Sequence, residues 1–239
     1  MGIRKIIKKK LENYSIKKKY GHFITKKTIK KDWPKKHLNR TALINAAVTN
    51  ILKHKKTCFY LEIGCNNNET FNSISLPPKY KYGVDPVHGG NIKKTSDNFF
   101  NKNKIKFDVI FVDGLHEYSQ CQRDVINSLK FLNKNGFLLM HDLIPLNWEM
   151  EFVPRIKPKS IWNGDVWKVG YELSKSSGFN FFIADIDNGV GFLQKKNIKY
   201  SYKKMNLLLK DMRFKYFLKI YKKFKIKNGE NALKIISNG

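Results

Sequence analysis

The chain has 239 residues and a formal net charge of +28, and its hydrophobic fraction of 41% is typical of a globular protein. This length supports the core of one domain, and the composition excludes a disordered chain. The N-terminus is too charged for a signal peptide, and no apolar run reaches the roughly 18 residues of a membrane span, so we expect a cytoplasmic protein. The three cysteines are isolated, which indicates reduced thiols rather than disulfides or a zinc site.

The positive charge comes almost entirely from lysine, which is densest over residues 3–36 and 195–227. A cationic surface attracts nucleic-acid phosphates and anionic lipid headgroups alike. Arginine, whose planar fork binds phosphates and base edges best, occurs only at Arg4, Arg40, Arg123, Arg155 and Arg213. The charge therefore does not favour a nucleic-acid partner, and we interpret it first as a compositional bias.

Residues 1–54 are predicted to form a basic helical extension. Between Ile3 and Tyr14 apolar residues recur at helical spacing with lysines between them, which predicts a short basic amphipathic helix. Such a helix can make peripheral contact with a membrane or dock on the domain, and docking is the preferred interpretation. A second helical pattern, from Leu38 to Leu52, leads into the core.

Residues 55–197 alternate between strand and helix patterns. The predicted strands are apolar without alternation, as is typical of parallel strands buried on both faces. They cover Cys58 to Ile63, Tyr80 to Val84, Phe107 to Val112 and Phe137 to His141. Helices are predicted at about Glu69 to Ile74 and Tyr118 to Leu132. This order predicts an α/β fold, with a Rossmann-like, doubly wound, mostly parallel sheet.

The last third of the chain continues this pattern and then changes. A helix is predicted from Gly164 to Lys175, followed by a terminal antiparallel strand pair over residues 179–194 whose turn contains Asp187 and Asn188. From Tyr202 to Phe224 the spacing predicts one long basic amphipathic helix. Residues 198–239 are therefore expected to be a basic helical tail.

The motif YLEIGCNNNETF, residues 60–71, is a strand that ends in an acid and a turn around Gly64. In an open α/β sheet the ligand lies beyond the carboxyl ends of the strands, so the first turn must let the backbone approach it closely. Gly64 permits this approach, and Asn66 to Asn68 tolerate left-handed conformations. The alternative is an ordinary tight turn.

The next predicted strand ends in YGVDP, which places Asp85 about twenty residues after the glycine turn. At that position a carboxylate accepts hydrogen bonds from both ribose hydroxyls of an adenosine cofactor. The alternative is a turn aspartate before a proline. Together the two motifs predict an adenosine site.

The segments LEIGCNNNETF, YGVDP, TSDNFF and FDVIFVDGLHEYSQCQRDVINSLKFLNKNGFLLMHD occur in the order seen in class I S-adenosylmethionine-dependent methyltransferases. Over residues 57–194 the chain resembles the small-molecule and sugar O-methyltransferase branch, in which DGxHxY and HD end two strands. The resemblance implies S-adenosylmethionine as cofactor. It implies that the methionine part contacts Glu62, Gly64, Cys65 and Asn66, the ribose Asp85, and the adenine Ser96 and Asp97. Asn68 departs from the pattern, because many relatives carry a second glycine there.

Asp113, Gly114 and His116 are predicted at the lip of the strand 107–112, where Asp113 and Gly114 would also contact the cofactor. Methyl transfer needs an aligned nucleophile and often a base for its proton. His116 is the first candidate for that base, because histidine titrates near neutrality. The alternative is that His116 only contacts the cofactor.

His141 and Asp142 end the strand 137–141 and should converge with Asp113 on the same rim. Asp113 and Asp142 are candidate ligands of Mg²⁺ or another divalent cation, as in some members of the resembled branch. Leu143 stands where metal-dependent relatives can carry Asn or Asp. The alternative is that His141 and Asp142 shape the acceptor pocket without metal, and His141 is the second candidate base.

The motif WNGDVWKVGYEL, residues 162–173, combines two tryptophans with Asp165 and Lys168. A helix that begins near Asp165 could present Trp162 and Trp167 to an acceptor, because ring faces pack well on indole. The alternative is that both tryptophans pack in the core. Asp187 is most simply a turn residue.

These observations predict methyl transfer from S-adenosylmethionine to an oxygen of a small molecule or of a sugar in a glycan. One alternative is methylation of nucleic acid, although no NPPY-type motif and no cysteine pair supports it. Another is a non-catalytic binding module that its basic helices tether to partners or membranes. The acidic and histidine residues at the strand ends argue against such an inactive site. The oligomeric state is not predicted.

Overall fold

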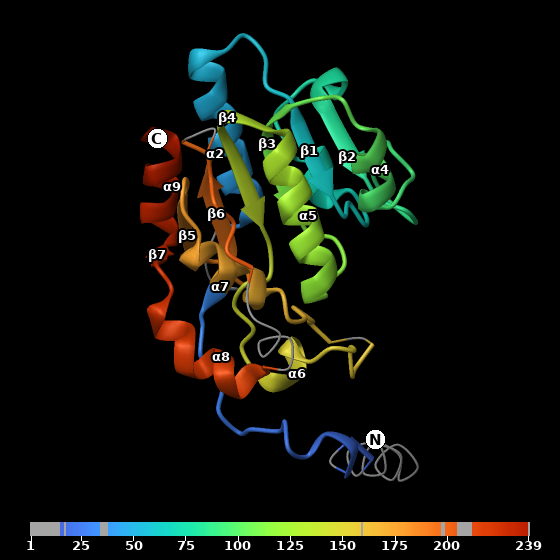
Figure 1. Cartoon of the computed structure of the whole chain (residues 1–239), viewed down its shortest axis with the longest axis vertical. Helices are drawn as coiled ribbons and strands as arrows, with labels where there is room; N and C mark the ends of the chain where they lie inside the picture. Colours follow the sequence, from blue (N-terminus) through green and yellow to red (C-terminus); the bar gives the residue numbers. More distant parts are fainter. Residues whose placement is uncertain are drawn as a thin grey trace.

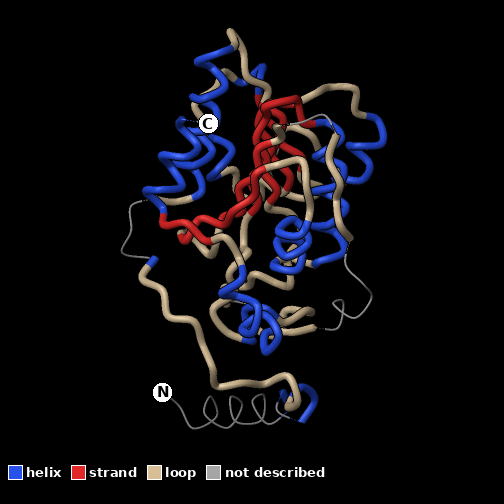
Figure 2. The backbone as a smooth tube through the Cα atoms, turned by 60° about the vertical axis from the view of Figure 1, so that its left-hand side comes forward, coloured by secondary structure: helices blue, strands red, loops and turns tan. Residues whose placement is uncertain are grey.

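The computed structural model describes residues 15–16, 18–33, 38–158, 160–196, 199–204 and 212–238. The basic helix predicted between residues 3 and 14 lies outside these ranges. The described residues build one seven-stranded sheet with helices on both faces (Figures 1 and 2). Among them, no helix is both long and apolar enough to cross a membrane.

The sheet has the strand order β2-β1-β3-β4-β6-β5-β7. The strands are β1 (Tyr60–Ile63), β2 (Lys81–Val84), β3 (Phe107–Val112), β4 (Leu132–Met140), β5 (Asn180–Asp185), β6 (Val190–Gln194) and β7 (Ile226–Asn228). The first four pair in parallel, β6 is antiparallel to both β4 and β5, and β7 is parallel to β5. The predicted mostly parallel sheet with an antiparallel pair is therefore confirmed.

Each face of the sheet packs against its own helices because alternate strand residues point to opposite faces. One face buries Tyr60 and Val109 under α2 (Arg40–His54) and α9 (Gly229–Asn238), which contact each other. The other face buries Leu61 and Ile110. Helices α4 (Ser96–Lys102), α5 (Tyr118–Phe131), α7 (Trp167–Lys175) and α8 (Phe214–Ile220) contribute to that second core. Short helices α3 (Glu69–Asn72), η2 (Pro78–Tyr80), α6 (Trp148–Glu151) and η4 (Tyr221–Lys223) complete the chain.

The single helix predicted from Tyr202 to Phe224 is wrong. Within the described residues, only α8 and the turn η4 are helical there, and the chain then enters the sheet edge as β7. At the start of the predicted helix, Tyr202 is non-helical and donates to Glu172. Beyond its end, Ile226 pairs with Ile183 of β5, so the predicted helical tail also contains a strand. Residues 226–238 thus belong to the same layers as the core, while the three-part division at residues 54 and 197 remains a prediction.

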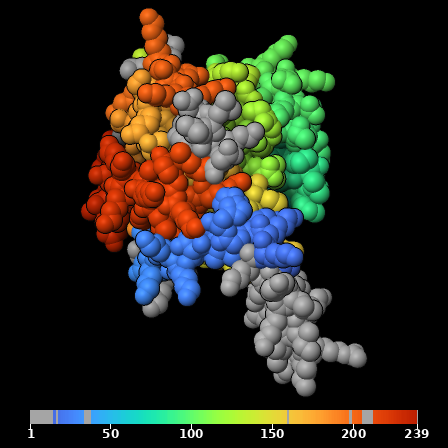
Figure 3. All heavy atoms as spheres, turned by 60° about the horizontal axis from the view of Figure 1, so that its bottom comes forward, coloured from blue at the N-terminus to red at the C-terminus, as the bar shows by residue number. Residues whose placement is uncertain are grey.

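Residues 18–33 form an arm, helical at residues 18–20 and irregular after the following turn, that runs beside the C-terminal segment (Figure 3). Lys215 Nζ donates to the His22 carbonyl at 2.7 Å, and Ile29 N donates to the Leu146 carbonyl at 2.8 Å. At the end of the arm, Lys31 and Trp33 both hydrogen-bond the Asp185 carboxylate. The arm therefore connects to the β5–β6 hairpin just before α2 begins.

Candidate active site

A cavity of about 810 Å³ opens at the carboxyl ends of β1 to β4. This volume falls in the range of about 300–1,000 Å³ that is usual for ligand pockets, and the position is the one where open α/β sheets bind ligands. All the predicted site residues line it: Glu62, Gly64, Cys65, Asn66, Asp85, Ser96, Asp97, Asp113, Gly114, His116, His141 and Asp142. Their individual roles remain predictions.

The turn after β1 has left-handed backbone at three positions, as the sequence predicts. Gly64 has φ +85°, and a Cβ there would lie 2.2 Å from the Asp113 carbonyl oxygen, so glycine is required by the approach of two strand ends. Asn66 and Asn68 have φ of 44° and 64°. The Asn68 side-chain oxygen accepts from Gly90 N at 2.6 Å. Asn68 therefore adopts a left-handed conformation without being glycine, and its side chain adds a hydrogen bond between two loops.

Asp85 is fixed by the backbone around it. Its carboxylate accepts hydrogen bonds from the N–H groups of Asn66, Val87 and His88 at 2.9, 2.9 and 3.0 Å. Burial by itself would raise the pKa of Asp85, but these three N–H groups outweigh it and lower the pKa below its ordinary value. An ionised carboxylate is thus held at one end of the cavity.

Behind Ser96, the cavity also reaches two residues of α5 that the sequence reasoning missed. Ser96 Oγ donates to Asp124 at 2.5 Å, and Gln120 Nε2 donates to the same oxygen at 3.0 Å. Burial raises the pKa of Asp124 to about 6, against the effect of these two hydrogen bonds. Gln120 and Asp124 stand four residues apart on one helix face, a spacing that was available in the sequence.

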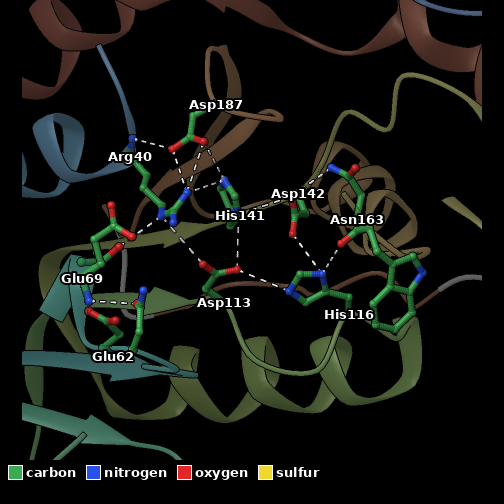
Figure 4. A network of polar contacts seen from close by, with 12 residues as sticks. Arg40, Glu62, Glu69, Asp113, His116, His141, Asp142, Asn163 and Asp187 are labelled. Atoms are coloured by element: carbon green, nitrogen blue, oxygen red, sulfur yellow. Dashed lines mark hydrogen bonds and ion pairs between the residues drawn. The ribbon is translucent and has the colours of Figure 1, made fainter. Parts of the chain in front are cut away.

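At the other end, two histidines and two aspartates form a polar network (Figure 4). His141 Nδ1 lies 3.3 Å from an oxygen of Asp113 and 3.3 Å from one of Asp142. His116 Nδ1 lies 3.1 Å from Asp142, and its Nε2 lies 3.7 Å from Asp113. The ends of β3 and β4 therefore bring together the four residues that the sequence predicts there.

His141 is buried with carboxylates at both ring nitrogens, because its Nε2 also lies 3.4 Å from Asp187. Burial alone would lower the pKa of His141, but the charges of Asp142 and Asp113 outweigh it and raise the pKa well above its ordinary value. Burial would raise the pKa of Asp113, yet the His141 charge leads the interactions that lower it. His141 is therefore an imidazolium between ionised aspartates.

His116 differs from His141 because one of its nitrogens faces a carbonyl. Its Nδ1 lies 2.6 Å from the Trp162 carbonyl oxygen, and its ring stacks on the Trp162 indole at 5.4 Å between centroids. A carbonyl oxygen can only accept, so this contact favours a proton on Nδ1 and makes Nε2 the nitrogen that can accept one. The His116 side chain lines the cavity.

The two tryptophans of the motif at residues 162–173 lie in different environments. Trp162 lines the cavity, whereas Trp167 is fully buried in the core, so only one of the two tryptophans meets the expectation. Asp165 accepts from Tyr118 N at 2.6 Å and pairs with Lys168 at 2.8 Å, and thereby caps α5 rather than its own helix. Gly164 packs directly on the His116 carbonyl, since a Cβ there would lie 1.6 Å from that oxygen.

Arg40 and Asp187 enter the network without having been predicted as site residues. Asp187 lies in the β5–β6 turn with φ 43°, as a turn residue, and also accepts from Arg40 Nη1 at 3.0 Å. Burial would raise the pKa of Asp187, but hydrogen bonding by His141 and the charge of Arg40 lower it strongly. The two residues are 147 positions apart, so no local sequence pattern links them.

Asp113, His141 and Asp142 each offer one ligand atom, and these atoms lie within 4.8 Å of one another. Next to them, Asn163 Nδ2 donates to Asp142 at 2.9 Å, while its buried side-chain oxygen has no hydrogen-bond partner. Carboxylate and amide oxygens suit Mg²⁺. The set fits a divalent cation if His141 gives up the proton that it holds between the two carboxylates.

Residues 41–143 match the family model of a methyltransferase domain. No curated protein sequence matches the chain significantly. Among solved structures, the chain is similar to the O-methyltransferase from Bacillus cereus in complex with SAH, with 12% identity over 69% of this chain and 85% of that one and a TM-score of 0.43. It is also similar to the O-methyltransferase TomG from Streptomyces achromogenes, with 10% identity over 68% and 82% and a TM-score of 0.45. A SAH-bound methyltransferase from Podospora anserina shows 14% identity over 82% and 98%, with a TM-score of 0.45. The family match covers the strand ends that build the cavity, because it runs from the start of α2 to just after β4.

Proposed function

We propose that this protein transfers the methyl group of S-adenosylmethionine to a hydroxyl oxygen of a small molecule or of a sugar in a glycan. One observation carries the proposal. The cavity lies mostly within the segment that matches the family model, and it is lined both by an ionised carboxylate, Asp85, and by a histidine, His116, whose Nδ1 faces the Trp162 carbonyl. Such an arrangement suits an adenosine cofactor beside a site of hydroxyl deprotonation.

The residues around the cavity fit the cofactor. Asp85 retains lone pairs for ribose hydroxyls, while Ser96 and Asp97 lie at the same end for the adenine. Glu62, Gly64, Cys65 and Asn66 line the turn where the methionine part would lie. When bound, the cofactor supplies an electrophilic methyl carbon on a sulfonium. The task of the chain is then to hold the acceptor oxygen in line and to remove its proton.

His116 is the residue that we assign to proton removal. Its Nε2 accepts the hydroxyl proton, and the resulting imidazolium is stabilised by Asp142 at 3.1 Å and by Asp113 at 3.7 Å. His141 is less suited, because its side chain is only 7% exposed, against 27% for His116, and its Nε2 already contacts Asp187 and Arg40 Nη1. Of the two candidate bases in the sequence, the contacts thus favour His116.

The rim of the cavity supports an acceptor with an apolar ring face. Leu115 and Ile161 are large apolar residues that remain 52% and 65% exposed, and both line the cavity together with Trp162. These side chains lie beside His116, whose ring stacks on Trp162. Sugar and aromatic rings pack well on such surfaces.

In a second version of the proposal, methyl transfer depends on a divalent cation that Asp113 and Asp142 would hold. Against a requirement for it, His141 already occupies the space between the two carboxylates. We therefore expect methyl transfer to persist in EDTA. Loss of transfer in EDTA, restored by Mg²⁺, would instead assign a metal-dependent mechanism.

The proposal is tested by incubating the protein with S-adenosylmethionine that carries a tritiated methyl group and with three acceptor pools: hydroxylated aromatic compounds, sugar nucleotides and free glycans, and RNA. We expect label in one of the first two pools, and we expect the labelled methyl group to be bound to oxygen as a methyl ether. Label in RNA alone would contradict the acceptor class and favour the nucleic-acid alternative.

A further inference from the structure

The cavity is acidic inside a strongly basic protein. Six carboxylates line it, from Glu62, Asp85, Asp97, Asp113, Asp124 and Asp142. Although the chain has 47 lysines and arginines, Arg40 is the one such residue among the described residues that line the cavity. Among the described residues that line the cavity, Arg40 is therefore the one cation whose charge does not depend on pH, and an entering anionic group would meet it there.

Arg40 reaches the cavity from the first position of α2. Its Nε donates to Thr70 Oγ1 at 3.1 Å, and its Nη1 donates to both oxygens of Asp187 at 3.0 and 3.2 Å. Within the described part of the chain, no hydrogen bond uses Nη2, and the side chain remains 26% exposed. A planar guanidinium held at two of its nitrogens presents the third in a fixed direction.

Thr70 adds a second donor at the same place. Its oxygen accepts from Arg40, so its hydroxyl proton is available, and Thr70 lines the cavity beside the turn that contains Gly64. Arg40 Nη2 and the Thr70 hydroxyl thus form a pair of donors in the cavity wall where the two side chains meet. Two donors on one side suit the two oxygens of a carboxylate.

We propose that Arg40, supported by Thr70, binds the α-carboxylate of the amino-acid tail of the cofactor. This inference rests on the proposed function, which places the methionine part at Glu62 and Gly64. The tail is zwitterionic, and its carboxylate would otherwise enter a cavity that is lined by six carboxylates. Asp187 acts as the positioning residue, because it holds the guanidinium at this part of the cavity wall.

A purely structural role for Arg40 makes a different prediction. Both Arg40 and Lys31 connect the N-terminal region to an aspartate of the β5–β6 hairpin, Arg40 to Asp187 and Lys31 to Asp185. Only Arg40 lines the cavity. Lys31→Met is therefore a matched control that removes a cation of the same kind without touching the proposed subsite.

The test compares two ligands by isothermal titration: S-adenosylhomocysteine, which has the amino-acid tail, and 5′-methylthioadenosine, which lacks it. We expect Arg40→Met to weaken S-adenosylhomocysteine binding by about 10- to 100-fold, as for loss of a charge-assisted pair, and to leave 5′-methylthioadenosine binding unchanged. Arg40→Lys should recover part of the loss, and Lys31→Met should change neither affinity.

Equal weakening of both ligands by Arg40→Met, or no weakening of either, would overturn the assignment. The wild-type protein provides a second test that does not depend on folding of a variant. The methyl ester of S-adenosylhomocysteine, which lacks the carboxylate charge, should bind about as weakly as Arg40→Met binds the free acid, and equal affinity for ester and acid would also overturn it. If wild-type protein binds none of these ligands, the proposed function itself fails.

Discussion

His116 and His141 show how neighbouring residues of one type acquire different chemistry. His116 lines the cavity and faces the Trp162 carbonyl, whereas His141 is buried between the carboxylates of Asp113 and Asp187. Sequence reasoning could identify both histidines at strand ends but could not distinguish them. The distinction depends on residues 46 positions away in one case and on the β5–β6 turn in the other.

At this scale, His116→Asn tests the assigned base. Asparagine can still donate to the Trp162 carbonyl but cannot accept the hydroxyl proton, so we expect the turnover number to fall by about 10²- to 10⁴-fold. Affinity for S-adenosylhomocysteine should stay close to that of the wild type. The measurement is steady-state methyl transfer to the acceptor that the labelling experiment identifies, and an unchanged turnover number would exclude His116 as the base.

Glu151 gives a residue-scale prediction outside the site. It is fully buried, one oxygen accepts from Trp167 Nε1 at 3.1 Å, and the other has no hydrogen-bond partner. Burial raises its pKa to about 7, against the Trp167 hydrogen bond and the charge of Lys168. The folded state therefore binds an extra proton, and the stability that this gives is complete below pH 4.5 and is lost as the pH rises through 7.

Glu151→Gln removes this titration. The difference in unfolding free energy between variant and wild type should therefore depend on pH. We expect it to be more favourable to the variant at pH 8 than at pH 5, by on the order of 1–3 kcal/mol. Urea unfolding at the two pH values measures the difference. The same gap between variant and wild type at both pH values would show that Glu151 does not titrate in this way.

At the scale of elements, the central strands could be predicted from sequence, but contacts between segments far apart in the chain could not. The runs that end at Ile63 and Val112 are mostly apolar and buried along their whole length, so these strands and the residues that follow them could be placed from sequence. The C-terminal segment could not, because β7 depends on pairing with β5, some forty residues earlier. The contact of Arg40 with Asp187 was likewise invisible, since it requires α2 to pack beside the hairpin.

The close approach of β1 and β3 predicts a large effect of one methyl group. Gly64→Ala would place a Cβ 2.2 Å from the Asp113 carbonyl at a left-handed backbone position, so we expect a loss of about 3 kcal/mol or more of unfolding free energy. Gly114→Ala at the adjoining strand end is the control. Its nearest neighbour, Ile63 Cγ2, would lie 3.4 Å away, so urea unfolding should show a small change. Equal losses would contradict the steric account.

The whole molecule combines an acidic cavity with a formal net charge of +28. Self-repulsion among the surface lysines destabilises the folded state, and salt screens it. We expect the melting temperature to rise between 0.05 and 0.5 M NaCl. The triple variant Lys26→Glu, Lys27→Glu and Lys30→Glu changes three exposed residues of the arm and lowers the net charge from +28 by 6 to +22, so its salt response should be smaller. A melting temperature that falls with salt would contradict net repulsion.

The central claim is that the cavity binds an adenosine methyl donor through Asp85, and titration with S-adenosylhomocysteine tests it most directly. The account predicts binding in the micromolar range to wild-type protein, weakened at least about tenfold in Asp85→Ala. The control is Asp108→Asn, because Asp108 also accepts a backbone N–H, from Phe59 at 3.0 Å, but does not line the cavity. Binding retained in Asp108→Asn and lost in Asp85→Ala would support the site. Absence of binding to the wild-type protein would contradict the account and favour a non-catalytic binding module.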